Sequence, residues 1–160
     1  MPHHAIPSVT GEKGITMAIE KAYTIPANAV VVGLCAGRHD MPVSDFIFPQ
    51  VVDPTDFRGM SRTVDAFLDT RVGTHISWEP RRNAASMDDE DGVEFICGDR
   101  PLVVYVTGLT ACVAAVIRGC AYNGVDLTLM HYNRATGEYI PQVVLGRAEP
   151  YPPLLSPSQG

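Results

Sequence analysis

The stretch VYVTGLTACVAAVIRGC, Val104 to Cys120, decides the fold, because within it the apolar pattern changes from that of a strand to that of a helix. The run LVVYV (102–106) is continuously apolar, as in a strand that is covered on both faces of a sheet. After the turn, apolar residues recur at helical spacing, and the stripe consists of Leu109, Cys112, Val113, Val116, Ile117 and Cys120. Asn123 and Gly124 end the predicted helix, since glycine commonly takes the left-handed position after the last turn.

The run VDLTLMHY (125–132) follows this helix and predicts a second strand. A strand, a helix of about four turns and another strand form a βαβ unit, so the two strands should be parallel and joined by a right-handed crossover. YIPQVVL (139–145) should then return as an antiparallel edge strand. Pro141 suits an edge, because proline cannot donate a hydrogen bond to a neighbouring strand.

The first half of the chain predicts further strands and one helix. Strand patterns occur at 17–25, 29–35, 45–52 (interrupted by Pro49), 74–80 and 93–97, and SMDDEDG (86–92) is predicted to be an acidic loop. Ser61 is predicted to be the N-cap of a helix over about 62–71. The sequence therefore predicts one Rossmann-like α/β domain over 17–147, with a mostly parallel sheet and a C-terminal antiparallel hairpin. A loose leader (1–16) and a flexible tail (148–160) should flank it.

Composition excludes several classes of protein. The chain has 160 residues, of which 46% are hydrophobic and 19% charged, as in a globular domain. A net charge of −6 without a cluster of Lys and Arg argues against binding of duplex nucleic acid. No apolar run reaches the ~18 to 20 residues that span a bilayer. Four cysteines without a CxxC pair predict buried reduced thiols in a cytoplasmic protein, and neither a metal site nor a cofactor is predicted.

The second face of the central helix is unusually poor in charge. It carries Ala111, Ala114, Ala115, Gly119 and Ala121, with Arg118 as the only charged residue. A helix that faces solvent normally has a polar side. We therefore expect this face to be covered, either by the rest of the domain or by a second subunit of a homo-oligomer.

Three loops are candidates for a ligand site, because ligands of open α/β sheets bind outside the carboxyl ends of the strands. The first loop holds Arg38, His39 and Asp40; the second holds Thr107, Gly108, Leu109 and Thr110; the third holds His131 and Arg134. The three loops meet at one edge of the sheet if the strand before Arg38 is parallel to the other two.

The residue types in these loops suit an anionic ligand. The first N–H groups of a helix attract anions, so the Thr107–Thr110 turn could hold phosphate, with hydroxyl groups from both threonines. Alternatively, Thr110 is only an N-cap and Gly108 only a turn residue. No P-loop or GxGxxG motif is present.

The charged and imidazole side chains of the other two loops leave alternatives open. Arg38 could bind phosphate through two parallel hydrogen bonds, and His39 could act as an acid or base with Asp40 nearby, or the three could form an ordinary turn. His131 could be catalytic, or a satisfied core histidine beside the apolar residues of its strand face. Arg134 could bind ligand or only decorate the hairpin.

The segment VYVTGLTACVAAVIRGCAYNGVDLTLMHYNRATGEYIPQ (104–142) resembles the Rossmann-like sensor domains of prokaryotic antiviral signalling. These are the CRISPR-associated Rossmann domains and the related SAVED domains, in which a strand, a turn of small and hydroxyl residues and a helix precede a Tyr-containing hairpin. The resemblance implies that a cyclic oligonucleotide or related messenger binds at a dimer interface on the loop Thr107–Thr110. Some relatives also cleave the ring slowly.

Three hypotheses of function follow. The first is a stand-alone domain that binds a small nucleotide messenger and either sequesters it or cleaves it slowly. The second is a metal-independent phosphodiesterase or transferase that uses His39 or His131 as acid or base. The third is a structural homo-oligomeric module, in which the apolar helix is only a subunit interface.

Overall fold

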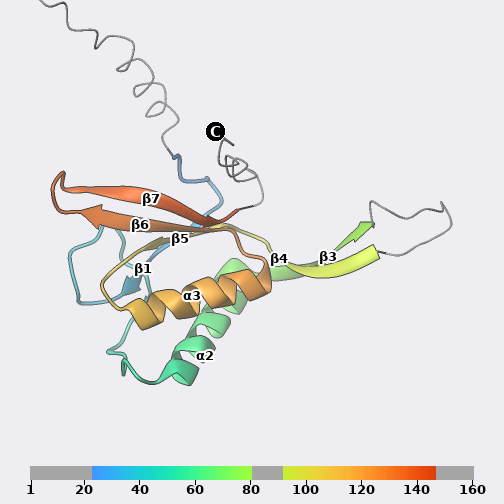
Figure 1. Cartoon of the computed structure of the whole chain (residues 1–160), viewed down its shortest axis with the longest axis horizontal. Coiled ribbons are helices and arrows are strands. Elements are labelled where there is room, and N and C mark those ends of the chain that lie inside the picture. The colour runs from blue at the N-terminus through green and yellow to red at the C-terminus, as the bar shows by residue number, and fades with distance from the viewer. Residues whose placement is uncertain (1–22, 81–91, 147–160) are drawn as a thin grey trace, which may run out of the picture.

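A five-stranded sheet, two helices and a separate two-stranded ribbon make up the part of the chain that the computed structural model describes, residues 23–80 and 92–146 (Figure 1). The strands of the sheet are β1 (Val30–Cys35), β2 (Phe46–Phe48), β5 (Leu102–Tyr105), β6 (Leu127–Asn133) and β7 (Glu138–Leu145). The helices are α2 (Phe57–Phe67), continued by the π-helical turn η1 (Leu68–Val72), and α3 (Thr110–Asn123). The ribbon consists of β3 (Thr74–Pro80) and β4 (Gly92–Gly98).

The sheet has the strand order β2-β1-β5-β6-β7. β1 is parallel to both β2 and β5, and β5 is parallel to β6, which confirms the predicted parallel βαβ unit around α3. β7 runs antiparallel to β6 at the edge, also as predicted, and Pro141 lies opposite Met130 there. The fold is thus α/β, with a mostly parallel sheet and a C-terminal antiparallel hairpin.

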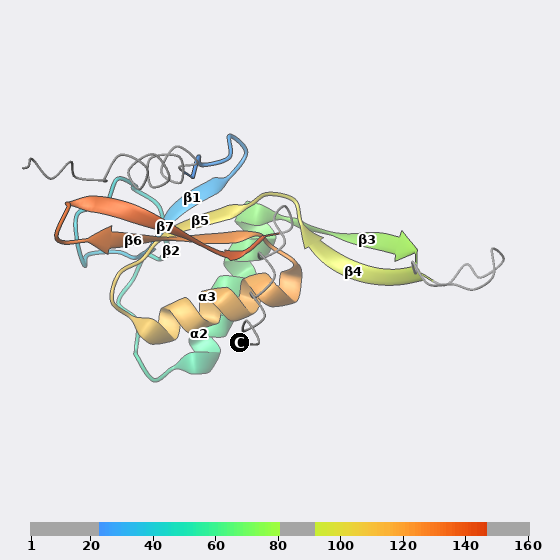
Figure 2. The same ribbon diagram turned by 45° about the horizontal axis from the view of Figure 1, so that its top comes forward.

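Both helices pack on the same face of this sheet (Figures 1 and 2). The core lies between them and the strands, where alternate residues such as Val32, Leu34 and Val104 are fully buried. On the opposite face, Tyr23, Met41 and other partly buried residues cover a smaller cluster around Val103 and Tyr105. A doubly wound fold has helices on both faces of the sheet. The described part of the chain therefore shows only one of the two helical layers of that arrangement.

Several predicted boundaries differ from the structure. Of the strand predicted at 17–25, only 23–25 lie within the described residues, and these are irregular. β2 is shorter than the predicted 45–52 and stops before Pro49, since proline cannot continue the ladder. The leader 1–16, nearly all of the acidic loop 86–92 and the tail 148–160 lie outside the described residues.

The prediction that Ser61 caps the first helix is wrong. The N-cap is Asp56, whose Oδ1 accepts a hydrogen bond of 2.9 Å from the N–H of Gly59, and Ser61 lies inside α2. Both residue types are good N-caps, but helix α2 starts one turn earlier because Met60 extends the buried stripe upstream of Val64. A carboxylate at this end of a helix also interacts favourably with its dipole.

Replacing Asp56 by alanine should lower the free energy of unfolding by about 1 kcal/mol, the usual cost of losing an N-cap. Ser61→Ala is the control, because the Ser61 hydroxyl only accepts a long 3.4 Å contact from Arg118. This second substitution should change stability by less than about 0.5 kcal/mol. Urea unfolding followed by circular dichroism measures both. Equal losses in the two variants would contradict the assignment of Asp56 as the cap.

The ribbon of β3 and β4 is the part of the fold that the sequence did not predict. Both strands were expected, but they pair with each other, from Thr74 opposite Gly98 to Pro80 opposite Gly92, and not with the main sheet. Figure 2 shows the ribbon extending away from the body. Its base is held where Gly98 donates a hydrogen bond to the carbonyl of Gly124. Across the residues that the structure describes, no helix is long and apolar enough to cross a membrane.

Candidate functional site

The carboxyl ends of β1, β5 and β6 meet at one edge of the sheet, as expected for parallel neighbours. β1 and β5 are neighbours in the sheet. The chain continues from β1 to β2 on one side of this pair and from β5 through α3 to β6 on the other side, so the two connections diverge. Such a divergence opens a crevice in α/β sheets. A cavity of about 640 Å³ occupies this place. Six of the predicted site residues line it, namely His39, Asp40, Thr107, Gly108, His131 and Arg134.

Three predicted site residues do not line this cavity. Arg38 lies beside an adjoining hollow, which His39 and Asp40 also line. Leu109 is partly buried against the main core, and Thr110 is the first residue of α3. The N-terminus of the helix thus faces the cavity through Thr107 and Gly108, with Leu109 turned towards the core.

The hydroxyl of Thr107 is buried and lacks an ordinary hydrogen bond. The residue is 3% exposed, and its Oγ1 has no hydrogen-bond partner within the described part of the chain. The thiol of Cys35 is close enough for Thr107 to lower the pKa of that thiol, but a thiol is only a weak partner. A buried hydroxyl without a good partner costs free energy. The wall of the cavity therefore contains a buried hydroxyl whose hydrogen-bonding capacity is not used.

The N-terminus of α3 also has unsatisfied donors. Its N-cap is Leu109, whose side chain makes no capping bond, so the alternative that Thr110 serves as the N-cap is wrong. The N–H of Leu109 donates to the carbonyl of Thr107 at 2.6 Å. Among the described residues, no partner accepts from the N–H groups of Gly108, Thr110 and Ala111. Such groups, together with the helix dipole, favour an anion.

Gly108 lies in open space. A Cβ atom built at this position meets no other atom within 4 Å, and its backbone does not need the left-handed region that glycine favours. Packing therefore does not require glycine here. Its missing side chain leaves room beside the helix N-terminus for something to approach the backbone.

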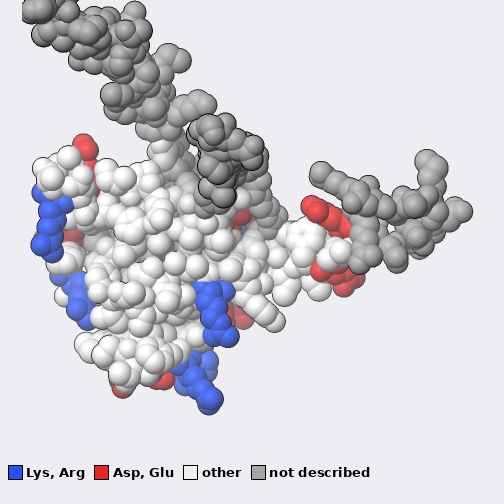
Figure 3. Space-filling model, in the orientation of Figure 1, with Lys and Arg blue, Asp and Glu red and all other residues white. Residues whose placement is uncertain are grey.

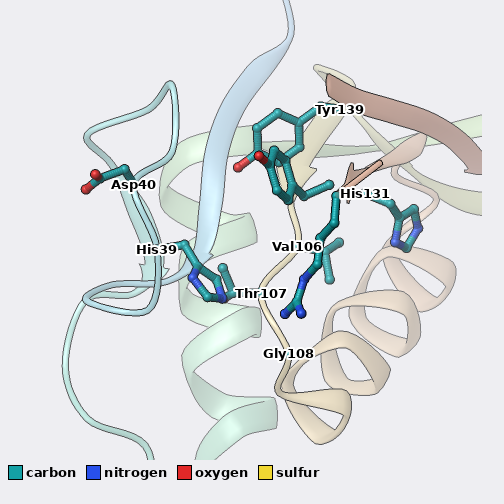
Figure 4. A pocket seen from close by; sticks show the side chains of 9 residues that line it. His39, Asp40, Val106, Thr107, Gly108, His131 and Tyr139 are labelled. Carbon is teal, nitrogen blue, oxygen red and sulfur yellow. The ribbon is translucent and has the colours of Figure 1, made fainter. Parts of the chain in front are cut away.

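The two histidines lie apart in the site. Figure 4 shows the imidazole of His39 directed towards Thr107, while the carboxylate of Asp40 points away from the other labelled side chains. His131 is exposed, so it is not a core histidine, and its Nε2 lies 2.8 Å from Oε1 of Gln142. Asp40 is thus not placed to orient His39, and His131 is instead oriented by an amide.

A group of tyrosines that the sequence reasoning missed forms one wall. Tyr132 and Tyr139, which both line the cavity, lie opposite each other on β6 and β7, with ring centroids 5.3 Å apart. Tyr105 meets Tyr139 edge to face at 4.7 Å. Burial, followed by the neighbouring phenols of Tyr132 and Tyr105, raises the pKa of Tyr139, so the ring stays neutral. The symmetric placement of Tyr132 and Tyr139 about the hairpin turn was the sequence signal that could have revealed this pair.

The floor beneath Thr107 holds two buried thiols. Burial raises the pKa of Cys35 at the end of β1, and the neighbouring thiol of Cys112 and the charge of Arg38 lower it in part. Burial and the proximity of Cys35 raise the pKa of Cys112 to about 12. All four cysteines are buried and free, as predicted. Both floor thiols are consequently neutral near pH 7 and are poor nucleophiles.

Stability should fall at alkaline pH because of such thiols. Burial raises the pKa of Cys120 from about 9 to about 12, so the folded state holds this proton more tightly than the unfolded state. Above pH 9 the unfolded chain ionises first, which lowers the free energy of unfolding by at most about 1.4 kcal/mol per pH unit for each thiol. Denaturant titrations between pH 8 and about pH 10.5 should show a shallower decline for Cys120→Ala than for the parent. Parallel declines would contradict this prediction.

Two arginines and two carboxylates lie at this end of the body, namely Arg38, Arg134, Asp40 and Glu138. Arg38 and Arg134 have no ion-pair partner among the described residues. Figure 3 shows basic side chains at the end of the body where the β6–β7 turn lies. The two arginines are therefore available to an anion, although Asp40 and Glu138 offset their charge. No group of His, Cys, Asp and Glu within the described ranges is arranged to hold a metal ion.

The fold and the site define an α/β protein with a polar cavity at the carboxyl edge of a mostly parallel sheet. The cavity combines a helix N-terminus, a buried hydroxyl, two imidazoles, an arginine and an aromatic wall. No protein-family model, curated protein or solved structure matches this chain.

Proposed function

We propose that this cavity binds a small phosphorylated ligand, and that the ligand is a nucleotide. Thr107 carries the proposal, because this residue lines the cavity and its buried hydroxyl lacks a good hydrogen-bond partner. It lies next to the unsatisfied N–H groups of Gly108, Thr110 and Ala111 at the start of α3. One phosphate group would accept from these donors together, and its charge would make these bonds stronger than those to a neutral acceptor.

Arginines would complete the phosphate site. Arg134 lines the cavity on the side of the β6–β7 turn and has no carboxylate partner among the described residues. Guanidinium groups bind phosphate through two parallel hydrogen bonds. Arg38, in the adjoining hollow, would add long-range attraction, as it already does for the thiolate form of Cys35.

The tyrosine wall supports a nucleotide over inorganic phosphate. Tyr132 is 53% exposed and lies against Tyr139, so one ring face is open to a ligand. Stacking of a base on an aromatic side chain contributes about 1–3 kcal/mol. A volume of about 640 Å³ lies within the range of about 300–1,000 Å³ that is usual for small-molecule sites.

The finer proposal is a Rossmann-like domain that binds a cyclic oligonucleotide messenger, as the resemblance of 104–142 implies. A cyclic ligand presents several phosphates, which suits a site where Arg134 and the α3 N-terminus face the same cavity. The four free, buried cysteines favour a reducing, cytoplasmic setting for such a ligand.

The test is a binding panel of cyclic di-, tri- and tetranucleotides, with AMP, ATP and inorganic phosphate as comparisons. Isothermal titration should detect at least one nucleotide, and a ligand at ~100 times its Kd should stabilise the fold by about 2.7 kcal/mol. Phosphate alone should bind more weakly than the best nucleotide, because it lacks the stacked base. The proposal is overturned if no nucleotide binds, or if phosphate binds equally well.

The samples from the binding panel also show whether the protein cleaves its ligand or only binds it. His39 faces Thr107, so it lies where the proposed phosphate would sit (Figure 4). Chromatography after denaturation should return an intact cyclic ligand if the protein sequesters it and linear products if it cleaves it. In the second case, His39→Ala should abolish product formation and leave binding within about threefold of the parent.

A further inference from the structure

The ribbon carries an exposed apolar face. Residues in register on one face of the two strands are Ile76 with Ile96 and Trp78 with Glu94. The exposed fractions are 71% for Ile76, 53% for Trp78 and 40% for Ile96. A two-stranded ribbon is at best marginally stable alone, because one of its faces has nothing to pack against. Exposed apolar groups of this kind mark an interaction site.

The described part of the ribbon is also acidic. Its only charged side chains other than His75 are Glu79 and Glu94, one on each face, and neither forms an ion pair. Figure 3 shows acidic side chains towards the outer end of the ribbon. A partner for the apolar face must therefore present both apolar and basic groups.

The outer side of α2 and α3 has these properties. There, Ser61, Asp65, Ala115, Arg118 and Tyr122 line a shallow hollow of about 290 Å³, which we call the helix surface. Tyr122 is 79% exposed, and Arg118 makes only a long 3.4 Å contact, to Ser61. Arg58 and Arg62 lie on α2 nearby, and none of these arginines has an ion-pair partner within the described residues. Figure 3 shows basic side chains over the helices.

We propose that the ribbon of one protomer docks on the helix surface of a second copy, and that the exchange is reciprocal. The face with Ile76, Trp78 and Ile96 would cover the charge-poor side of α3, and Glu94 would lie near Arg118. The ribbon extends away from the helices of its own protomer, so a second copy is needed for this contact (Figures 1 and 2). If the two copies are related by a twofold axis, the exchange closes a dimer in which each contact occurs twice, whereas one-way docking would build rings or filaments.

Trp78 and Tyr122 would anchor this interface. Large aromatic side chains contribute most of the binding free energy in protein interfaces, and here one is exposed on each half of the contact. The residues of the helix surface do not line the nucleotide cavity, so the inference stands whether or not a nucleotide binds. Helix α2 of the same chain already packs on part of the charge-poor face of α3, where Gly119 lies against Val64 and Leu68, so the ribbon would cover only the exposed remainder.

The sole tryptophan of the chain reports on the contact directly. Sedimentation velocity over a concentration series should show a monomer and a dimer in exchange, and Trp78 emission should shift to the red as dilution exposes the ring. A monomer at every concentration overturns the proposal. So does a dimer whose Trp78 emission does not change on dissociation, because the ribbon would then lie outside the interface.

Charge exchange identifies the surface that receives the ribbon. Glu94→Arg and Arg118→Glu should each raise the dimer dissociation constant about tenfold or more. When both substitutions are combined in one chain, the dissociation constant should return most of the way to the parent value. Glu79→Arg is the matched control, since it makes the same charge change on the opposite face of the ribbon and should have little effect. Failure of the double variant to recover, with both single variants folded by circular dichroism, overturns docking on the helix surface.

Discussion

Replacing Gly124 by alanine should lower the free energy of unfolding by about 2–4 kcal/mol, more than the same change at Gly37. Gly124 takes the left-handed conformation after α3, with φ of 62°. A Cβ atom there would also lie 2.1 Å from the carbonyl oxygen of Ile96, in the backbone of β4. A backbone atom in a strand cannot move aside as the end of a flexible side chain can. The strain of the conformation and the steric overlap therefore add.

Gly37 provides the control for the conformational part. Its φ is 72°, close to that of Gly124, but a Cβ atom at Gly37 meets nothing within 4 Å. Gly37→Ala should therefore cost only about 1 kcal/mol, the penalty of the left-handed conformation alone. Urea unfolding of both variants gives the difference. A difference near zero would show that the Ile96 carbonyl yields to the methyl group.

Only part of the environment of Gly124 could be predicted from the sequence. The helical stripe and the Asn-Gly pair predicted where α3 ends, because both are local properties of the chain. The contact with Ile96 was not predictable, because it depends on the position of a ribbon that is distant in the sequence. Nothing in the patterns of 74–80 and 93–97 distinguishes strands that join a sheet from strands that pair only with each other.

The candidate site was predictable to a similar degree. The rule for carboxyl ends of parallel strands brought the loops with His39, Thr107 and His131 to one edge, once β1 proved parallel to β5. Side-chain direction was not predictable in this way. Asp40 points outwards and Arg38 belongs to the adjoining hollow, because the loop turns at Gly37 with a positive φ.

Replacing Gly108 by valine should weaken binding of the best nucleotide by about 100-fold or more, equivalent to about 2.7 kcal/mol. The added side chain would project into the open space beside the α3 N-terminus, where the proposed phosphate lies. It would keep the phosphate from the N–H groups of Gly108 and Ala111, and these charge-assisted bonds would be lost together. Isothermal titration with the ligand found in the panel measures the effect.

Thermal unfolding separates a blocked site from a damaged fold. Because a Cβ atom at Gly108 meets nothing within 4 Å and the backbone there is not left-handed, the valine variant without ligand should keep the melting temperature within about 2 °C of the parent. Ala135→Val is the matched control, since it adds a similar volume on an exposed turn that does not line the cavity. This control should bind as the parent does. If Gly108→Val binds the nucleotide normally, the phosphate does not lie at the start of α3.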